Sequence, residues 1–323
     1  MAYSNEIYAK AERILEKRRE NAETEAELRS ESIKAKLPEV KNIQTQLNEI
    51  GLEISQLFLY PGDKEAKVAE LREKSKALVS KRDTILSSNG YSTDALKPEY
   101  TCSACNDKGY INGRRCACHI KILCELMRDE VSRFAPLDEC TFDNFSLDYY
   151  SQKPDEDGIV PRQRAEKILD ASRRFAQNFS KDSKSLMFLG STGLGKTHLS
   201  LAIANVVINR GFSVCYGTSH NICEDLRAEM FGRDDRITYT NSKVINCDLL
   251  IIDDLGTEIT NQYNIATIYN IINTRILEKK PTIISTNYDY DELLDKYDQR
   301  ITSRLSGEYT QLYLIGEDVR NKK

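Results

Sequence analysis

The second half of the chain alternates short apolar runs with segments of helical periodicity. Amphipathic segments separate the first four runs, a pattern typical of parallel strands that helices cover on both faces. The pattern therefore predicts an α/β fold, with a parallel sheet and flanking helices, over residues 161–323. The predicted strands are "SLMFLG" (185–190), "SVCYG" (213–217), "DLLIID" (248–253), "PTIIST" (281–286) and "QLYLI" (311–315).

The N-terminal region (1–95) follows a helical pattern instead. Residues 5–36 are highly charged with sparse apolar positions, and they predict a solvated helix. From 40 to 57 the apolar residues alternate steps of three and four, the spacing of a coiled-coil seam. A turn at "YPGD" (60–63) and a helix over about 64–87 complete an antiparallel hairpin. Such a hairpin would serve as a spacer or dimerisation rod, or as a docking surface for a protein partner.

Two shorter segments separate these regions. Residues 96–125 hold four closely spaced cysteines and predict a small unit of their own. Residues 126–160 are mixed in character, end in the polar "SQKPDEDG", and predict a connector.

Composition narrows the class of protein. The net charge is −4 and 30% of residues are charged, so any contact with DNA must come from a local patch. The first twenty residues hold no apolar core of a secretory signal, and no apolar run is long enough to span a membrane. Nine cysteines, an odd number, favour reduced thiols over a disulfide framework. We therefore expect a cytoplasmic protein.

The segment "GSTGLGKT" (190–197) satisfies the pattern G-x-x-x-x-G-K-[S/T] between a predicted strand and a predicted helix. In such a loop the backbone N–H groups surround phosphates, and the helix N-terminus adds its positive end. We expect Lys196 to contact the β- and γ-phosphates of ATP, and Thr197 to offer its hydroxyl to Mg²⁺. The predicted nucleotide-binding residues are Gly190, Ser191, Thr192, Gly193, Leu194, Gly195, Lys196 and Thr197.

Polar side chains follow the next two predicted strands. Asp253 and Asp254 end "LLIIDD", so we expect Asp253 to join Thr197 at Mg²⁺. Asp254 is the candidate for polarising the attacking water, or else a solvated acid at a strand end. Its carboxylate reaches one methylene less far than that of a Glu, which suggests slow hydrolysis. Asn287, in "STNY", is a candidate for holding that water against the γ-phosphate, although such a residue alone is more often part of a turn.

Arg300 and Arg304 lie four residues apart in "DQRITSRLSG", on one face of a predicted helix. One of them would reach the nucleotide of a neighbouring subunit and stabilise the transition state, with Arg304 the favoured candidate. The alternative is a pair of surface arginines.

The order of "GSTGLGKT", "LLIIDDLG", "STNY" and "RITSRL" resembles the AAA+ ATPases, and within them the DnaC/DnaI helicase loaders and the IstB transposition proteins. About twenty residues follow "RITSRL", too few for the C-terminal helical lid of most AAA+ proteins, which these relatives also lack. The ending "LIGEDVR" resembles the terminal motif of this branch, which implies that Arg320 contacts the nucleotide. By the same resemblance, "CTFDNF" (140–145) implies that Phe142 and Phe145 lie near the adenine.

The four clustered cysteines have the spacing C-x2-C-x10-C-x-C. Four thiolates give a closed tetrahedral site that suits structural zinc. His119 could replace a neighbouring cysteine, because adjacent residues rarely ligate one ion together; free thiols or an iron–sulfur cluster would also fit the spacing. A metal would replace a core that so few residues cannot form. This arrangement resembles that of DnaI-type loaders, which carry a zinc-binding segment between partner-binding helices and the ATPase. The predicted ligands are Cys102, Cys105, Cys116 and Cys118.

The resemblance implies a loader of the replicative hexameric helicase, which grips the helicase through its N-terminal hairpin and zinc unit. ATP would control assembly and release, with self-association through the ATPase domain when ATP is bound. An ATP-dependent regulator of a transposase and an AAA+ adaptor with no DNA role are the competing hypotheses. The resemblance also implies binding of single-stranded DNA, and the segment 219–246 mixes cations with rings, although a solvated helix and loop would look similar. Its candidate residues are Arg227, Phe231, Arg233, Arg236, Tyr239 and Lys243.

Overall fold

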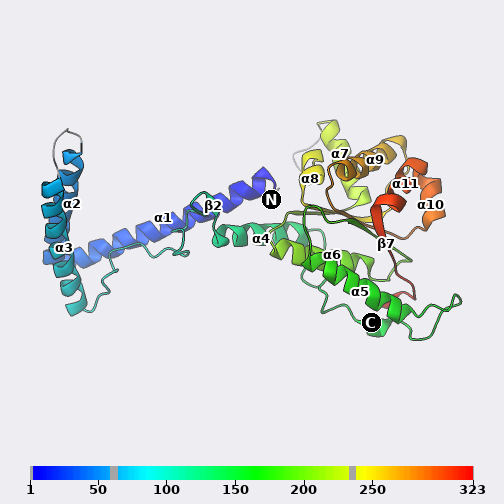
Figure 1. The fold of residues 1–323 in the computed structure, drawn as a ribbon, viewed down its shortest axis with the longest axis horizontal. Coiled ribbons are helices and arrows are strands. Elements are labelled where there is room, and N and C mark those ends of the chain that lie inside the picture. The colour runs from blue at the N-terminus through cyan, green and yellow to red at the C-terminus, as the bar shows by residue number, and fades with distance from the viewer. Residues whose placement is uncertain (1–2, 59–64, 233–237, 323) are drawn as a thin grey trace. The chain divides into compact units, whose positions relative to one another are not determined.

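The computed structural model describes residues 3–58, 65–232 and 238–322, with the side chains of 321 and 322 excepted. The turn predicted at 60–63 lies outside the described residues, as do Arg233 and Arg236. The chain divides into two compact units, one of residues 12–118 and one of residues 1–11 with 119–323 (Figure 1).

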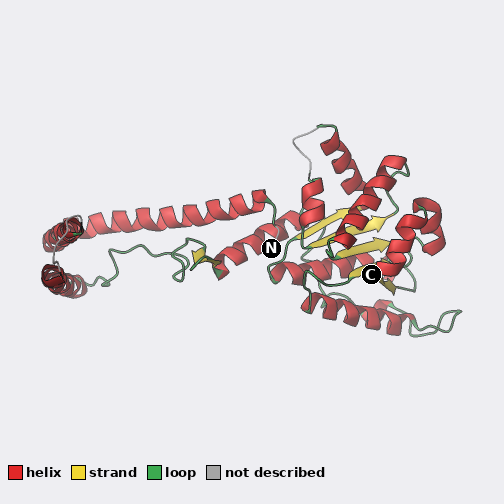
Figure 2. Cartoon of the chain, turned by 45° about the horizontal axis from the view of Figure 1, so that its top comes forward, coloured by secondary structure: helices red, strands yellow, loops and turns green. Residues whose placement is uncertain are grey.

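The larger unit is built on a five-stranded sheet in the order β4-β5-β6-β3-β7, with every neighbouring pair parallel. Helices cover both faces (Figure 2), so the predicted α/β fold is confirmed. The strands are β3 (Ser185–Leu189), β4 (Val214–Thr218), β5 (Leu249–Leu255), β6 (Thr282–Thr286) and β7 (Tyr309–Tyr313). The helices that follow the connector are α5 (Pro161–Gln177), α6 (Lys196–Asn209), α7 (Ser219–Met230), α8 (Asn241–Asn246), α9 (Gln262–Leu277), α10 (Tyr290–Tyr297) and α11 (Gln299–Glu308).

The position of β6 organises one end of the sheet. It lies between β5 and β3, although it follows both in the chain. Parallel strands end at the same edge, so the loops after β3, β5 and β6 meet there. The apolar run from Leu249 to Ile252 is fully buried, which fixes β5 and therefore the two acids that end it.

A helix links the cysteine segment to the larger unit. This helix, α4 (Ala117–Ser132), begins within the cysteine motif and ends past residue 126, where the sequence predicts a connector. The short 3₁₀ helix η1 (Leu147–Tyr149) is the regular element of the remaining connector.

The N-terminal helix α1 (Asn5–Lys36) has the predicted extent but not the predicted solvation. Its apolar side chains, among them Ile7, Leu15 and Ile33, are 2–3% exposed. Near its start, the Tyr3 hydroxyl donates a 2.8 Å hydrogen bond to the carbonyl of Gly211. The prediction of a solvated helix is therefore wrong for this face, because few apolar residues at helical spacing are enough to make a buried stripe.

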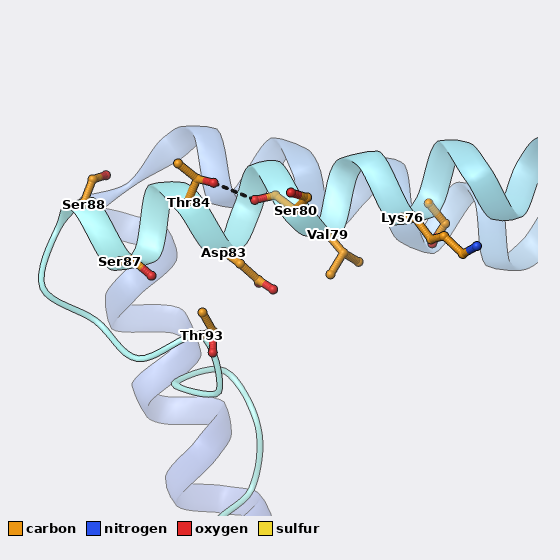
Figure 3. A pocket seen from close by; sticks show the side chains of 9 residues that line it. Lys76, Val79, Ser80, Asp83, Thr84, Ser87, Ser88 and Thr93 are labelled. Carbon is orange, nitrogen blue, oxygen red and sulfur yellow. Dashed lines mark hydrogen bonds between the residues drawn. The ribbon is translucent and has the colours of Figure 1, made fainter.

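The helices α2 (Pro38–Leu57) and α3 (Glu65–Ser88) pack against each other. Val40, Ile43, Val68 and Leu71 are buried, whereas Ile54 and Leu57, towards the end of α2, are only half-buried. A shallow depression on α3 and the loop after it is lined by small hydroxyl side chains (Figure 3). Its one carboxylate, Asp83, pairs with Arg82 at 2.7 Å, and its one ammonium group, Lys76, pairs with Glu73 at 2.7 Å, so the depression carries little net charge.

Candidate functional site

The loop 190–197 joins β3 to α6. Gly193 and Gly195 have φ angles of 80° and 84°, a region that a side chain disfavours. Gly195 is the N-cap of α6, so the loop delivers the chain directly into the helix N-terminus. The backbone is therefore shaped to receive an anion.

Lys196 is 5% exposed, and its ammonium group lies inside the loop. Nζ donates to the carbonyls of Gly190 (2.6 Å) and Ser191 (2.8 Å) and to Oδ1 of Asn287 (2.7 Å). Burial lowers the pKa of Lys196 to about 8, although the carboxylates of Asp254 and Asp253 oppose the shift. The structure thus brings Asn287 to the loop through its contact with Lys196.

Hydroxyl groups surround the buried carboxylate of Asp253. Tyr216 donates to Oδ2 at 2.8 Å, Thr197 donates to Oδ1 at 3.1 Å, and Ser285 also donates to Oδ1. Burial and the charge of Asp253 raise the pKa of the Tyr216 phenol, so Tyr216 stays a donor. Tyr216 and Ser285 were missed by sequence reasoning, because nothing in a strand sequence shows which side chain faces a neighbouring strand's carboxylate.

Asp254 stands in the left-handed region with a φ of 51°, next to an irregularity in the pairing of β5 with β6. Its N–H donates to Ser285 Oγ (2.9 Å), and its carbonyl accepts from Ser219 Oγ and Thr257 Oγ1 (both 2.9 Å). Asp tolerates this conformation better than Glu does. Burial and the neighbouring Asp253 raise the pKa of the Asp254 carboxyl, which favours a role as a proton acceptor.

The chain from Leu314 to Arg320 runs along the phosphate loop. The N–H of Val319 donates to the carbonyl of Gly193 at 3.1 Å. A Cβ on Gly193 would meet the Asp318 carboxylate at 1.9 Å, and one on Gly190 would meet the Leu314 carbonyl at 2.2 Å. These two glycines therefore accommodate protein as well as phosphate.

Arg320 lies close enough for its charge to act on the site. Burial, the larger effect, lowers the pKa of Lys196 and raises that of Asp254, and the charge of the Arg320 guanidinium lowers the pKa of both. The side chain of Arg320 is exposed, whereas the backbone N–H of Arg320 donates to Oδ1 of Asp318 at 2.9 Å. Asp318 was missed by sequence reasoning, since only the tertiary fold brings it to the loop.

Aromatic residues flank the other side of the loop. The Tyr150 hydroxyl donates to the carbonyl of Leu194 at 2.8 Å, and a Cβ on Gly195 would meet the Phe145 ring at 2.8 Å. Phe142 instead has the guanidinium of Arg173 over its ring. Of the two rings predicted near the adenine, the structure thus places Phe145 against the loop.

Arg300 and Arg304 lie on α11, above one ring. Their guanidinium carbons are 5.5 Å and 4.8 Å from the centroid of Tyr269. Arg304 Nε also donates to Asn273 at 2.9 Å, and Arg300 pairs with Asp298 at 3.1 Å. The described contacts of both arginines are therefore with residues of α9, α11 and the turn before α11.

A glycine-rich loop entering a helix, a buried lysine within it, and an acid pair two strands away together define a P-loop nucleotide-binding domain. Residues 164–305 match the family model of the IstB-like ATP binding protein, so the chain carries an IstB-like ATP-binding domain, as the sequence motifs predict.

Known proteins are similar to about half of this chain. The chain is 29% identical over 168 residues to a protein named replicative helicase loader DnaC from Buchnera aphidicola subsp. Baizongia pistaciae, which covers 51% of this chain and 63% of that one. It is 26% identical over 166 residues to the protein of that name from Escherichia coli (strain K12), covering 51% and 62%. A crystal structure described as the DnaC helicase loader is similar with a TM-score of 0.47 and 25% identity, covering 56% of this chain and 99% of that one. The chain thus spans less than two thirds of the length of the curated relatives.

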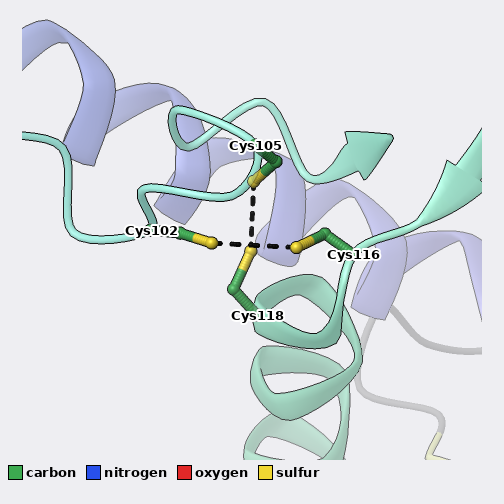
Figure 4. Close-up of side chains that lie close together, drawn as sticks. All are labelled: Cys102, Cys105, Cys116 and Cys118. Atoms are coloured by element: carbon green, nitrogen blue, oxygen red, sulfur yellow. Dashed lines mark hydrogen bonds between the residues drawn. The ribbon is translucent and has the colours of Figure 1, made fainter. Parts of the chain in front are cut away.

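The structure brings Cys102, Cys105, Cys116 and Cys118 together (Figure 4). Their sulfur atoms all lie within 4.8 Å of one another, with Cys102 to Cys116 at 3.7 Å and Cys105 to Cys118 at 3.4 Å. A tetrahedral zinc–thiolate site with bonds of about 2.3 Å has sulfur atoms about 3.8 Å apart. The four thiols therefore fit a zinc ion. His119 is buried on α4 and stands outside this group of described ligands.

Backbone groups support the cysteine loops. The buried carboxylate of Asp107 accepts from the N–H groups of Thr101 (2.8 Å) and Cys102 (3.0 Å), and the N–H of Gly109 donates to Cys105 Sγ at 3.3 Å. The N–H of Cys105 lowers the pKa of the Cys102 thiol to about 7. Asp107 was also missed by sequence reasoning, because an acid in a polar loop shows no sign of being buried.

The structure corrects the predicted DNA track in part. Tyr239 is 3% exposed, and its hydroxyl donates to the carbonyl of Tyr216 at 2.9 Å. Lys243 pairs with Glu130 and donates to the carbonyl of Thr238 at 3.0 Å. These two side chains serve the fold and are not available to stack on bases or contact phosphates. Phe231 is 56% exposed, and Arg227 lies 3.9 Å from Glu224.

Among the described helices, none is long and apolar enough to cross a membrane.

Proposed function

We propose that this protein is an ATPase that loads the replicative hexameric helicase onto DNA. The observation that carries the proposal is the joint presence of the IstB-like ATP-binding domain and the similarity of about half the chain to proteins named as DnaC loaders. The N-terminal helices and the cysteine unit supply the surface that grips the helicase, since they lie outside the matched domain.

ATP is the substrate of this site. The N–H groups of residues 190–197 and the ammonium of Lys196 bind the phosphates of ATP. When ATP binds, Lys196 gives up its hydrogen bonds to the loop carbonyls and donates to phosphate oxygens instead. The adjacent hydroxyl of Thr197 and carboxylate of Asp253 would hold Mg²⁺, which would neutralise charge at the phosphates. Tyr216 and Ser285 hold the Asp253 carboxylate in one orientation.

The attacking water is held by two groups of this chain. Asp254 accepts its proton, aided by a raised pKa, and Asn287 orients it by way of its amide. The carboxylate of Asp254 is short, so hydrolysis is slow and acts as a switch between an ATP-bound and an ADP-bound shape. Arg320 adds positive charge at the same nucleotide.

Self-association in the ATP state completes the site with an arginine from a second copy. Arg304 or Arg300 is that group, since the two lie four residues apart on α11 and share one face, over the ring of Tyr269. The cysteine unit binds one zinc ion per chain through Cys102, Cys105, Cys116 and Cys118, and single-stranded DNA is the nucleic acid bound.

Size-exclusion chromatography of the chain with its host's replicative helicase, with ATP and with ADP, tests the proposal. We expect a nucleotide-sensitive complex that is lost when residues 1–118 are deleted. A matched control is Lys196→Ala, which keeps those residues but abolishes nucleotide binding and should make the complex insensitive to ATP. No complex under any condition would contradict the loader function and favour a regulator of a transposase, which the family match also accommodates.

A further inference from the structure

The cysteine unit ends in a small hairpin with a distinct surface. Strands β1 (Tyr110–Ile111) and β2 (Arg114–Arg115) pair antiparallel, with Tyr110 opposite Arg115 and Ile111 opposite Arg114. Asn112 and Gly113 form the turn with φ angles of 50° and 76°, the combination that an Asn-Gly hairpin requires. The N–H of Cys116 donates to the carbonyl of Gly109 at 2.8 Å and continues the ladder. The hairpin is therefore well defined despite its length.

The hairpin concentrates positive charge in a chain whose net charge is −4. Residues 108–115, "KGYINGRR", contain three cations and no acid. The nearest acid in sequence, Asp107, is fully buried and its carboxylate is turned to the N–H groups of Thr101 and Cys102. Lys108, Arg114 and Arg115 are exposed. This patch is the local basic surface that the overall composition requires of a nucleic-acid contact.

Apolar side chains accompany these cations. Tyr110 is 41% exposed and Ile111 is 40% exposed. Directly opposed residues share a face, so Tyr110 lies on the same face as Arg115 and Ile111 on the same face as Arg114. A ring beside a guanidinium matches the alternation of base and phosphate along a single strand.

We propose that the hairpin of residues 108–115 is a contact site for single-stranded DNA, with Tyr110 stacking on a base and Arg114 and Arg115 binding phosphates. The site is separate from the nucleotide loop and does not depend on ATP hydrolysis. It shares with the proposed function only the identity of the nucleic acid. It takes the role that Tyr239 and Lys243 cannot fill, since those side chains are engaged in the fold.

The test is fluorescence anisotropy of a labelled oligothymidine with the full zinc-loaded chain at several salt concentrations. We expect Arg114→Gln with Arg115→Gln to weaken binding about tenfold and to reduce the salt slope by about 1.4, since each phosphate contact contributes about 0.7. We expect Tyr110→Ala to weaken binding on the order of tenfold, and Tyr110→Phe to preserve it.

The matched control is Lys74→Gln with Lys81→Gln, which removes the same charge from exposed positions on α3. Zinc content, measured for each variant, shows whether the cysteine unit is intact. Comparison of Tyr110→Ala with Tyr110→Phe tests the site without changing its charge. Binding by the arginine variant equal to wild type, or equal to the lysine control, would overturn the proposal. The absence of DNA binding by wild type at low salt would also overturn it. If the arginine variant lost the helicase complex while its DNA binding stayed unchanged, the hairpin would be a protein contact and the proposal would again be overturned. The loader function would survive unchanged DNA binding by the arginine variant and absent DNA binding by wild type, because formation of the helicase complex is measured separately.

Discussion

The hydroxyl of Tyr216, on strand β4, donates a 2.8 Å hydrogen bond to Oδ2 of Asp253 on the neighbouring strand β5. Both side chains are buried, so this bond fixes the carboxylate without competition from water. Removing it by Tyr216→Phe should raise the Mg²⁺ concentration needed for half-maximal ATP hydrolysis by about tenfold, the lower end of what outer-shell partners of a metal contribute. Titrating turnover with Mg²⁺ measures this effect.

Tyr239→Phe is the control for that experiment, since it removes a buried hydroxyl bonded to the Tyr216 carbonyl but not to Asp253. The same Mg²⁺ response in both variants would mean that Tyr216 serves packing alone. Nucleotide affinity measured in the presence of a chelator should stay unchanged in both.

The buried ammonium of Lys196 predicts a pH dependence of nucleotide binding. Its pKa, lowered to about 8 by burial, means that the nucleotide-free site loses its positive charge as pH rises through 8. Bound phosphates favour the charged form, so binding takes up a proton above pH 8, and affinity falls by up to about tenfold per pH unit there. Calorimetry in buffers of different ionisation enthalpy should detect this uptake at pH 9 and not at pH 6.5. A flat affinity from pH 7 to 9.5 would contradict the assignment, and Lys196→Ala should bind no nucleotide at either pH.

The left-handed backbone of Asp254 separates its conformational role from its chemical one. Asp254→Asn keeps a residue that tolerates a φ of 51°, so we expect an unchanged melting temperature and a loss of hydrolysis of about 10²-fold or more. Asp254→Glu retains the carboxylate but disfavours the backbone, which should cost about 1 kcal/mol of unfolding free energy. Thermal melts and turnover, measured together, distinguish the two. Full hydrolysis by the Asn variant would remove Asp254 from the mechanism.

The cysteine group predicts one zinc ion per chain. Cys105→Ser should lose that zinc, and hydrogen exchange should then show lost protection over residues 102–118, because a metal takes the place of a core there. Nucleotide binding should persist, since residues 190–197 belong to the other compact unit. Cys223→Ser, at a buried cysteine of α7 outside the group, is the control and should keep its zinc. Metal analysis of wild type that finds none would contradict the site.

The local sequence pattern is enough to predict the strands and the phosphate loop, because the signal for each lies within a few consecutive residues. The same is true of the four cysteines, whose spacing indicates a shared site that the fold brings together. The roles of Tyr216 and Tyr239 could not be predicted in this way. Tyr216 bonds a residue 37 positions away and Tyr239 one 23 positions away, and such pairing depends on strand order. From sequence alone Tyr239 is a candidate DNA contact, because an aromatic residue among cations looks the same in sequence whether its ring is exposed or buried.

The close approach of residues 314–320 to the phosphate loop changes how substitutions in that loop must be interpreted. A Cβ on Gly193 would meet the Asp318 carboxylate at 1.9 Å, so the Asp318 side chain would have to turn away from the loop. A loss of ATP binding in such a variant would therefore combine two defects, one in the ligand cradle and one in the docking of the C-terminal segment. Asp318→Gly offers a way to separate them, because it clears the space beside Gly193 while leaving the loop sequence intact.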